Sequence, residues 1–156
     1  MGHRKPPRPI TERLRQGSWL VERVQDGLRA LSKQDRGFVS GGVRSRVSES
    51  LHLDEALRER YPGDPRWDYL LGDSEKDRIV ALEVHPATGS QVKQVIAKKR
   101  AAMKQLAGHL TDGLWLWFWA ASGKVGLAPQ GKYRAQLEEA GIHFVGRMLQ
   151  EKDLDV

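Results

Sequence analysis

The eight residues from Leu114 to Ala121, LWLWFWAA, are apolar at every position, and they constrain the fold more than any other segment. A strand with two apolar faces belongs in the middle of a sheet that is covered on both sides. A second strand is expected over residues 78–85 (RIVALEVH), and between the two strands residues 91–109 carry apolar side chains at helical intervals. A strand, a helix and a further strand predict an α/β fold, in which a mixed central sheet is flanked by helices.

The N-terminal part of the chain differs in composition from the rest. Residues 1–10 contain three prolines and three basic residues, so we expect a disordered basic arm. An N-terminal helix is predicted over residues 11–33 by its apolar spacing, and a Gly-rich linker follows up to residue 42. Residues 43–156 are then expected to form the α/β domain. Its further predicted elements are a helix over 43–60, a short strand over 67–71, a helix over 132–140 closed by Gly141, and a last strand over 142–149.

The charge of the chain indicates the class of partner. The 156 residues carry a formal charge of +6, and residues 1–36 alone hold nine Lys and Arg against four Asp and Glu, a net +5. Such a balance favours polyanions, with nucleic acid ahead of an anionic membrane surface. The absence of cysteine excludes disulfides and thiolate zinc sites and is typical of a reducing compartment. No apolar run approaches the ~20 residues that span a bilayer. We therefore expect a cytoplasmic protein that binds nucleic acid and no membrane.

Two polar residues stand out in the strand over 78–85. Because alternate residues of a strand share a face, Glu83 and His85 lie on the same side as Ile79 and Ala81. Burying such a pair without partners costs several kcal/mol, so the two residues either lie at a solvated sheet edge or serve a site.

Asp68 lies in the preceding predicted strand, with fourteen residues between it and Glu83. If the two strands pair, their carboxylates come close together and repel unless a cation lies between them. A hard divalent ion such as Mg²⁺ or Mn²⁺ is the expected cofactor.

An acid on one strand, then Glu-x-His on the next, then a helix and a further strand, resembles the metal-binding core of the PD-(D/E)XK nuclease superfamily. The resemblance covers roughly residues 43–121. It implies a restriction-endonuclease-like fold, hydrolysis of nucleic-acid phosphodiester bonds, and Asp68 and Glu83 as ligands of Mg²⁺ or Mn²⁺. An accessory acid is often found on the preceding helix in this family, and Glu49 or Glu55 fills that position here.

The chain departs from the family pattern at the lysine. His85 occupies that position, where it is expected to act as a third metal ligand or to orient a water molecule. Some members of the superfamily carry the lysine on the following helix, and Lys93 is the residue expected there. In addition, the nearest proline, Pro65, precedes Asp68 by three residues instead of one. Four further basic residues of this helix are expected to bind the nucleic-acid backbone: Lys98, Lys99, Arg100 and Lys104.

Three interpretations remain open from the sequence. In the first, the protein is a metal-dependent nuclease and hydrolase. In the second, it is a catalytically inactive nuclease-like domain that binds nucleic acid, DNA included, or another protein. In the third, the protein is an ordinary α/β interaction domain whose acids are incidental: Asp68 pairs with Arg66 or Arg78, and Glu83 and His85 face solvent at the edge of a half-buried strand.

The alternating tryptophans Trp115, Trp117 and Trp119 admit three roles. They pack in the core, stack on nucleic-acid bases, or form an exposed row that joins two copies of the chain in a homodimer.

Overall fold

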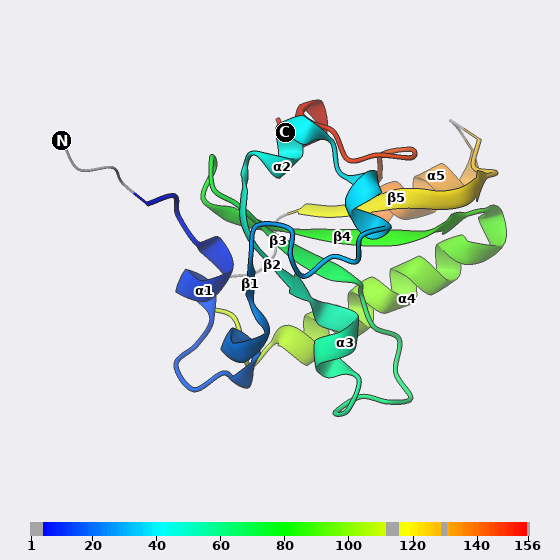
Figure 1. The fold of residues 1–156 in the computed structure, drawn as a ribbon. Helices are drawn as coiled ribbons and strands as arrows, with labels where there is room; N and C mark the ends of the chain where they lie inside the picture. Colours follow the sequence, from blue (N-terminus) through cyan, green and yellow to red (C-terminus); the bar gives the residue numbers. More distant parts are fainter. Residues whose placement is uncertain (1–4, 112–115, 129–130, 156) are drawn as a thin grey trace.

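The computed structural model describes residues 5–111, 116–128 and 131–155 and contains a six-stranded sheet (Figure 1). The strands follow one another across the sheet in chain order, β1 to β6. The first four pair antiparallel, whereas β4, β5 and β6 run parallel. The predicted class, an α/β fold with a mixed central sheet flanked by helices, is confirmed. The strands are β1 (Gln25–Asp26), β2 (Val47–His52), β3 (Tyr69–Asp73), β4 (Arg78–Ala87), β5 (Leu116–Val125) and β6 (Ile142–Phe144).

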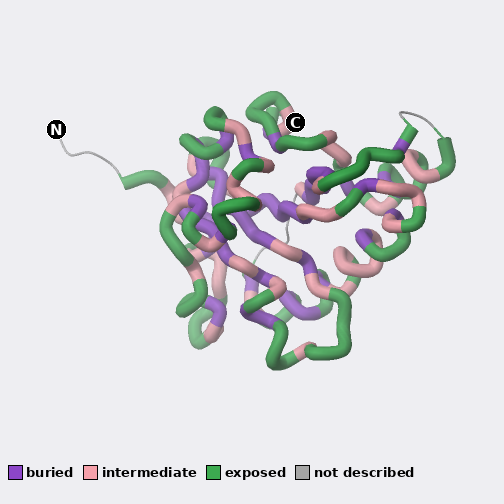
Figure 2. The backbone as a smooth tube through the Cα atoms, turned by 45° about the vertical axis from the view of Figure 1, so that its right-hand side comes forward, coloured by how far each residue is buried: buried purple, intermediate pink, exposed green. Residues whose placement is uncertain are grey.

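Helices and short turns of helix cover both faces of this sheet. One face carries α1, η1, α3, α4 and α5, and the other carries η2, α2 and η3 together with their connecting loops. Figure 2 shows the buried segments concentrated along the strands between these two layers. The helical elements are α1 (Pro9–Arg13), η1 (Trp19–Arg23), η2 (Asp35–Phe38), α2 (Gly41–Arg44), α3 (Leu53–Leu57), α4 (Gly89–Leu106), α5 (Lys132–Glu139) and η3 (Glu151–Leu154).

The centre of the molecule is the unit of β4, α4 and β5. The side chains of β5 alternate between the two cores: Trp117 and Trp119 pack under α4, whereas Phe118 and Ala120 pack on the opposite face. Helix α4 turns an apolar stripe, made of Val92, Val95, Ala102 and Leu106, toward the sheet. Two apolar faces on β5 require cover on both sides, and the two helical layers provide it. The tryptophans of β5 that the structure describes therefore belong to the core, and Trp115 lies outside the described residues.

The helix predicted over residues 43–60 is wrong. This segment contains the strand β2, which is preceded by α2 and followed by α3. Ser48 and Ser50 are weak helix formers, and pairing with both β1 and β3 stabilises the extended backbone. Two full strands, β2 and β3, therefore precede β4.

The long helix predicted over residues 11–33 is also wrong. Helix α1 ends at Arg13, and η1 and the short strand β1 follow. Gly17 and Gly27 adopt positive φ angles of 87° and 51°, which interrupt a helix. In addition, α1 already begins at Pro9, within the segment expected to be disordered, and Pro9 and Ile10 are buried.

The C-terminal part follows the prediction more closely. Helix α5 agrees with the helix expected over 132–140, and Gly141 closes it with a φ of 72°. The last strand is shorter than predicted: β6 ends at Phe144, and Gly146 turns the chain with a φ of 77°. In the described part of the chain, no helix combines the length and the apolar character needed to cross a membrane.

Candidate active site

Asp68 and Glu83 meet where β3 begins beside β4. Leu82 pairs with Tyr69 across the two strands, so the next residue of β4 lies opposite Asp68. The backbone N–H of Asp68 donates to Glu83 Oε1 at 3.0 Å, and the N–H of Val84 donates to Asp68 Oδ2 at 2.9 Å. These reciprocal hydrogen bonds hold the two carboxylates side by side. The predicted approach of the two acids is confirmed.

Burial makes this pair of acids electrostatically unusual. Glu83 is fully buried, and desolvation together with the nearby Asp68 carboxylate raises its pKa to about 8, although Lys98 opposes the shift. Desolvation also raises the pKa of Asp68, against the opposing effects of the Val84 N–H and Lys98. Two carboxylates in a site of low polarity cannot both be ionised at neutral pH without a nearby cation. Shifts of this kind are typical of functional sites, although structural ion pairs produce them as well.

The cation that the structure supplies is Lys98 of α4. Its Nζ donates to Glu83 Oε2, and only 21% of its side chain is exposed. Burial of the ammonium opposes its charge, but Glu83 and Asp68 outweigh this effect and raise the pKa of Lys98. The sequence pattern places Lys98 among the basic residues of the helix surface. Its spacing from Val95 and Ala102, three residues before and four after, is the signal that places it on the sheet-facing side.

His85 lies beside the acids but is held by a different partner. Its Nε2 makes a hydrogen bond of 2.6 Å with Gln91 Oε1, and its Nδ1 is 3.7 Å from Glu83 Oε2. The backbone carbonyl of His85 accepts a hydrogen bond from Trp119 Nε1 at 3.0 Å. The imidazole is therefore anchored next to the carboxylate pair, with a fifth of its side chain exposed. Like the contact of Lys98 with the acids, the presence of Gln91 in this cluster is not predicted by the sequence pattern.

The other basic residues predicted for the site lie elsewhere on α4. Lys93 is five residues from Lys98, about 140° around the helix, and it lines a pocket on the outer side of α4 with Arg100 and Lys104. Lys99 donates to the carbonyl of Ala140 and lies 5.4 Å above the ring of Trp117. The structure therefore brings Lys98, and none of these four, to the two acids.

Neither of the two expected accessory acids contacts Asp68 or Glu83 among the described residues. Glu49 lies on β2, not on a helix, and its carboxylate accepts hydrogen bonds from the backbone N–H groups of Ile10 and Thr11 and from the Thr11 hydroxyl. Glu55 lies on α3, where it is exposed and pairs with His52 at 3.0 Å. Glu49 therefore stabilises the start of α1, and Glu55 is a surface residue.

The incidental pairing of Asp68 with an arginine is not what the structure contains. Arg66 pairs with Asp54 at 2.8 Å, and Arg78 pairs with Asp73 at 3.2 Å. Asp68 is instead bound to the backbone of β4, so its position depends on the register of β3 against β4.

The donor atoms of this cluster suit a small, hard cation. Within the described residues no three His, Asp or Glu side chains form a metal-binding group. Mg²⁺, however, is commonly held by one or two carboxylates, with water and substrate phosphate completing its shell. Asp68 Oδ1 accepts no hydrogen bond from the described residues, and Glu83 Oε2 accepts one only from the Lys98 side chain. The two carboxylates therefore fit Mg²⁺ or Mn²⁺, and His85 is the adjacent nitrogen donor.

No protein-family model, no curated protein and no solved structure matches this chain.

Proposed function

We propose that this protein is a metal-dependent nuclease that hydrolyses phosphodiester bonds of nucleic acid. The observation that carries the proposal is the pair of buried carboxylates of Asp68 and Glu83. Backbone N–H groups hold the two side by side, and Lys98 of α4 donates to Glu83. Burial of charged groups costs stability even when they are partly paired, and titratable groups with strongly perturbed pKa values are typical of catalytic sites.

The order of elements supports a restriction-endonuclease-like core of the PD-(D/E)XK type. Two antiparallel strands, β2 and β3, precede β4, and α4 then crosses over to β5, which pairs parallel with β4. Asp68, immediately before β3, and Glu83 on β4 correspond in order to the metal-binding acids of that family. Lys98 fits the version of the pattern in which the lysine has moved to the following helix, in place of Lys93.

The roles of the residues follow from their positions. Asp68 and Glu83 would hold Mg²⁺ or Mn²⁺. When bound, such an ion lowers the pKa of a water molecule and polarises a phosphoryl oxygen. Lys98 is placed to stabilise negative charge that develops on the phosphate. His85, held by Gln91, is placed to orient a water molecule at the open side of the cluster.

A specific observation favours a second candidate function. Glu83 has a cationic partner within the protein itself, because Lys98 Nζ donates to its carboxyl group. A nuclease-like domain that has lost catalysis would keep such an ion pair for stability, and it would bind nucleic acid or a protein partner through its surface.

The test is a cleavage assay with plasmid, single-stranded DNA and RNA in Mg²⁺ or Mn²⁺. We expect metal-dependent cutting that falls by about a hundredfold or more in Glu83→Gln and Asp68→Asn. The matched control is Glu55→Gln, which removes an exposed acid and should retain wild-type cutting. Absence of cutting of every substrate, in protein that still binds nucleic acid, would favour the inactive binding module.

Metal binding is tested separately by the melting temperature. Because an ion that binds only the folded protein stabilises it, Mn²⁺ should raise the melting temperature of the wild type. Asp68→Asn should abolish this rise and Glu55→Gln should leave it unchanged. An equal rise in all three proteins would place the ion elsewhere.

A further inference from the structure

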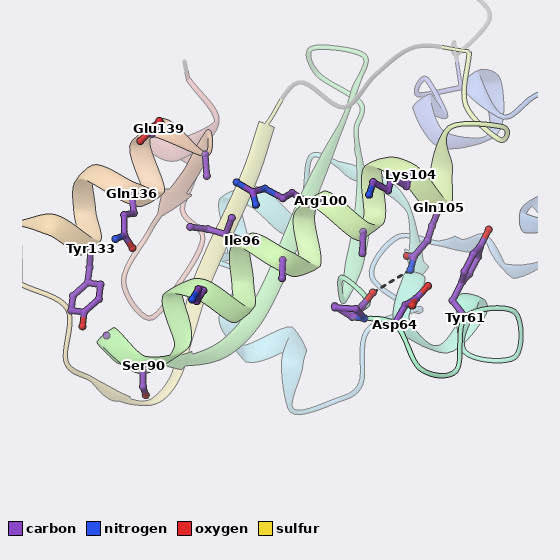
Figure 3. Close-up of a pocket in the computed structure, with 16 residues that line it drawn as sticks. Tyr61, Asp64, Ser90, Ile96, Arg100, Lys104, Gln105, Tyr133, Gln136 and Glu139 are labelled. Carbon is purple, nitrogen blue, oxygen red and sulfur yellow. Dashed lines mark hydrogen bonds between the residues drawn. The ribbon is translucent and has the colours of Figure 1, made fainter.

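A pocket lies on the outer side of α4. It measures about 1270 Å³, and its walls are α4, the α5 helix and the loop between α3 and β3. Figure 3 shows α4 running between α5, with Tyr133 and Gln136, and the loop that carries Tyr61 and Asp64. None of the residues assigned above to metal binding lines this pocket. Its volume is ample for a drug-sized or nucleotide-sized ligand.

One wall of the pocket carries three cations. Lys93, Arg100 and Lys104 are spaced by seven and four residues, so they lie along one side of α4 at separations of about 10 and 6 Å. Among the described residues, no acid forms an ion pair with any of the three. The two acids that line the pocket, Asp64 and Glu139, lie on the opposite walls (Figure 3). A row of unpaired cations on one helix favours an extended anion such as a phosphate backbone.

Gln105 supplies an unsatisfied hydrogen-bond acceptor at the same pocket. Only 4% of this residue is exposed, and its Nε2 donates to the carbonyl of Pro65 at 3.1 Å, the dashed line in Figure 3. Because a carbonyl can only accept, this bond fixes the amide orientation. Gln105 Oε1 is then a buried acceptor with no partner. Buried polar atoms are rarely left without a partner, so a hydrogen-bond donor is expected at this atom.

Two tyrosines stand at opposite ends of the pocket. Tyr61 belongs to the loop after α3, and Tyr133 belongs to α5 (Figure 3). Tyr133 packs directly against the backbone of Gly89, where a Cβ atom would lie 2.4 Å from the ring. Both tyrosines are half-buried, and Lys132 Nζ lies 5.0 Å above the Tyr133 ring. Aromatic rings beside a cationic track are typical of proteins that stack unpaired bases.

We propose that this pocket binds unpaired nucleotides of single-stranded nucleic acid. Phosphates lie along Lys93, Arg100 and Lys104, a base N–H donates to Gln105 Oε1, and a neighbouring base stacks on Tyr61. A duplex presents phosphates but not free base edges and faces, because its bases are stacked and paired.

The inference rests on the proposed function, since it names the substrate class of the nuclease. Gln105 and Lys98 are seven residues apart on the same side of α4, about 10 Å along its axis. Pro65, the partner of Gln105, precedes Asp68 by only three residues. The loop that forms one wall of the pocket therefore continues directly into the segment that carries Asp68.

The cationic wall is tested by binding of a fluorescent single-stranded DNA oligonucleotide in EDTA, where no metal-dependent cutting occurs. Arg100→Glu with Lys104→Glu should weaken binding by about tenfold or more, because two phosphate contacts become repulsive. The matched control is Lys33→Glu with Lys124→Glu, which changes the net charge equally at exposed positions outside the pocket. Equal weakening in both double variants would mean that only net charge matters and would overturn the proposal.

Base contacts are tested with an abasic oligonucleotide of the same length. The wild type should bind the base-containing strand about fivefold or more tightly than the abasic strand. Gln105→Met and Tyr61→Ala should each narrow this difference. Tyr61→Ala leaves the backbone hydrogen bonds of Tyr61 in place and removes a ring that is only half-buried, so it remains informative if Gln105→Met fails to fold. No preference of the wild type for bases, or tighter binding of duplex than of single strand, would overturn the proposal.

The two proposals fail in distinguishable ways. If binding in EDTA depends on the pocket residues but no cutting occurs in Mn²⁺, the pocket proposal is supported and the nuclease proposal is wrong. If cutting depends on Glu83 but not on Arg100 and Lys104, the nuclease proposal is supported and the pocket proposal is wrong.

Discussion

At the scale of single residues, the cluster of Glu83, Asp68 and Lys98 combines three ionisable groups that would each be unfavourable alone. Glu83 is fully buried, and its carboxylate oxygens are shared between the Asp68 N–H and the Lys98 ammonium. Removal of one member of such a buried pair leaves an uncompensated charge, whereas removal of both is far less costly.

Lys98→Met is therefore expected to lower the free energy of unfolding by about 2 kcal/mol, less than for a fully enclosed pair because part of the lysine is exposed. In the Glu83→Gln background the same change should cost much less. A double-mutant cycle from urea unfolding measures the difference. Equal losses in both backgrounds would show that Lys98 contributes through packing and not through its charge.

His109 is a second residue whose ionisation is linked to stability. Its Nδ1 lies 2.7 Å from Ser18 Oγ, and burial, together with the nearby Arg60, lowers its pKa from the ordinary value of 6.5. The unfolded chain therefore binds a proton at a pH where the folded protein does not. The corresponding stability is present above pH 6.5 and is lost as the pH falls below it.

The expected outcome is a pH-dependent difference between the wild type and His109→Gln. Between pH 7.5 and pH 5.5 the melting temperature of the wild type should fall more than that of the variant. Parallel curves for the two proteins would show that His109 is not the residue that titrates in this range.

At the scale of elements, the local sequence pattern was sufficient to predict secondary structure where a segment is buried in the same way along its whole length. The strand β4, the helix α4 and the strand β5 were predictable because apolar runs and a long apolar stripe are read from neighbouring residues alone. The alternation along β4 also placed Glu83 and His85 on one face, and the pairing of β3 with β4 brought Asp68 to them. The acids of the candidate site were therefore predictable from the sequence.

The strand β2 and the position of Lys98 were not predictable in the same way. The pattern of β2 is compatible with a helix, and what decides its conformation is pairing with β1 and β3, which are distant in sequence. Lys98 sits among five basic residues of α4, and only the packing of the helix on the sheet separates it from the rest.

Glu49 is a buried acid that stabilises a helix and is not part of the candidate site. Its carboxylate accepts hydrogen bonds from the N–H groups of Ile10 and Thr11 and from the Thr11 hydroxyl, so it holds α1 against β2. Glu49→Gln replaces one acceptor oxygen by a donor and should destabilise the protein by about 1–3 kcal/mol. Glu55→Gln, at the exposed pair with His52, should change stability by less than about 0.5 kcal/mol. Similar small effects of both changes in urea unfolding would contradict the role of Glu49.

At the scale of the whole molecule, both ends of the described chain are fastened to the sheet by buried charge. The N-terminal segment is held by Glu49, and the C-terminal η3 segment is held near β3 by Arg46, which contacts both Asp73 and Asp155. Arg46 and Asp73 are almost fully buried, at 4% and 1% exposure. The two ends pack on opposite faces, so each closes one of the two cores.

This arrangement predicts that Arg46 supports the fold and not the nucleic-acid pocket. Arg46→Met removes the main partner of a buried carboxylate and should lower the free energy of unfolding by about 3 kcal/mol, while Asp73 keeps its contact with Arg78. Asp155→Asn removes only an exposed partner and should cost less than about 1 kcal/mol. At a temperature where both variants are folded, their affinity for single-stranded DNA should equal that of the wild type, because the pocket lies on the outer side of α4 and Arg46 does not line it. Weaker binding by folded Arg46→Met would mean that the packing of the C-terminal segment is coupled to the pocket across the sheet.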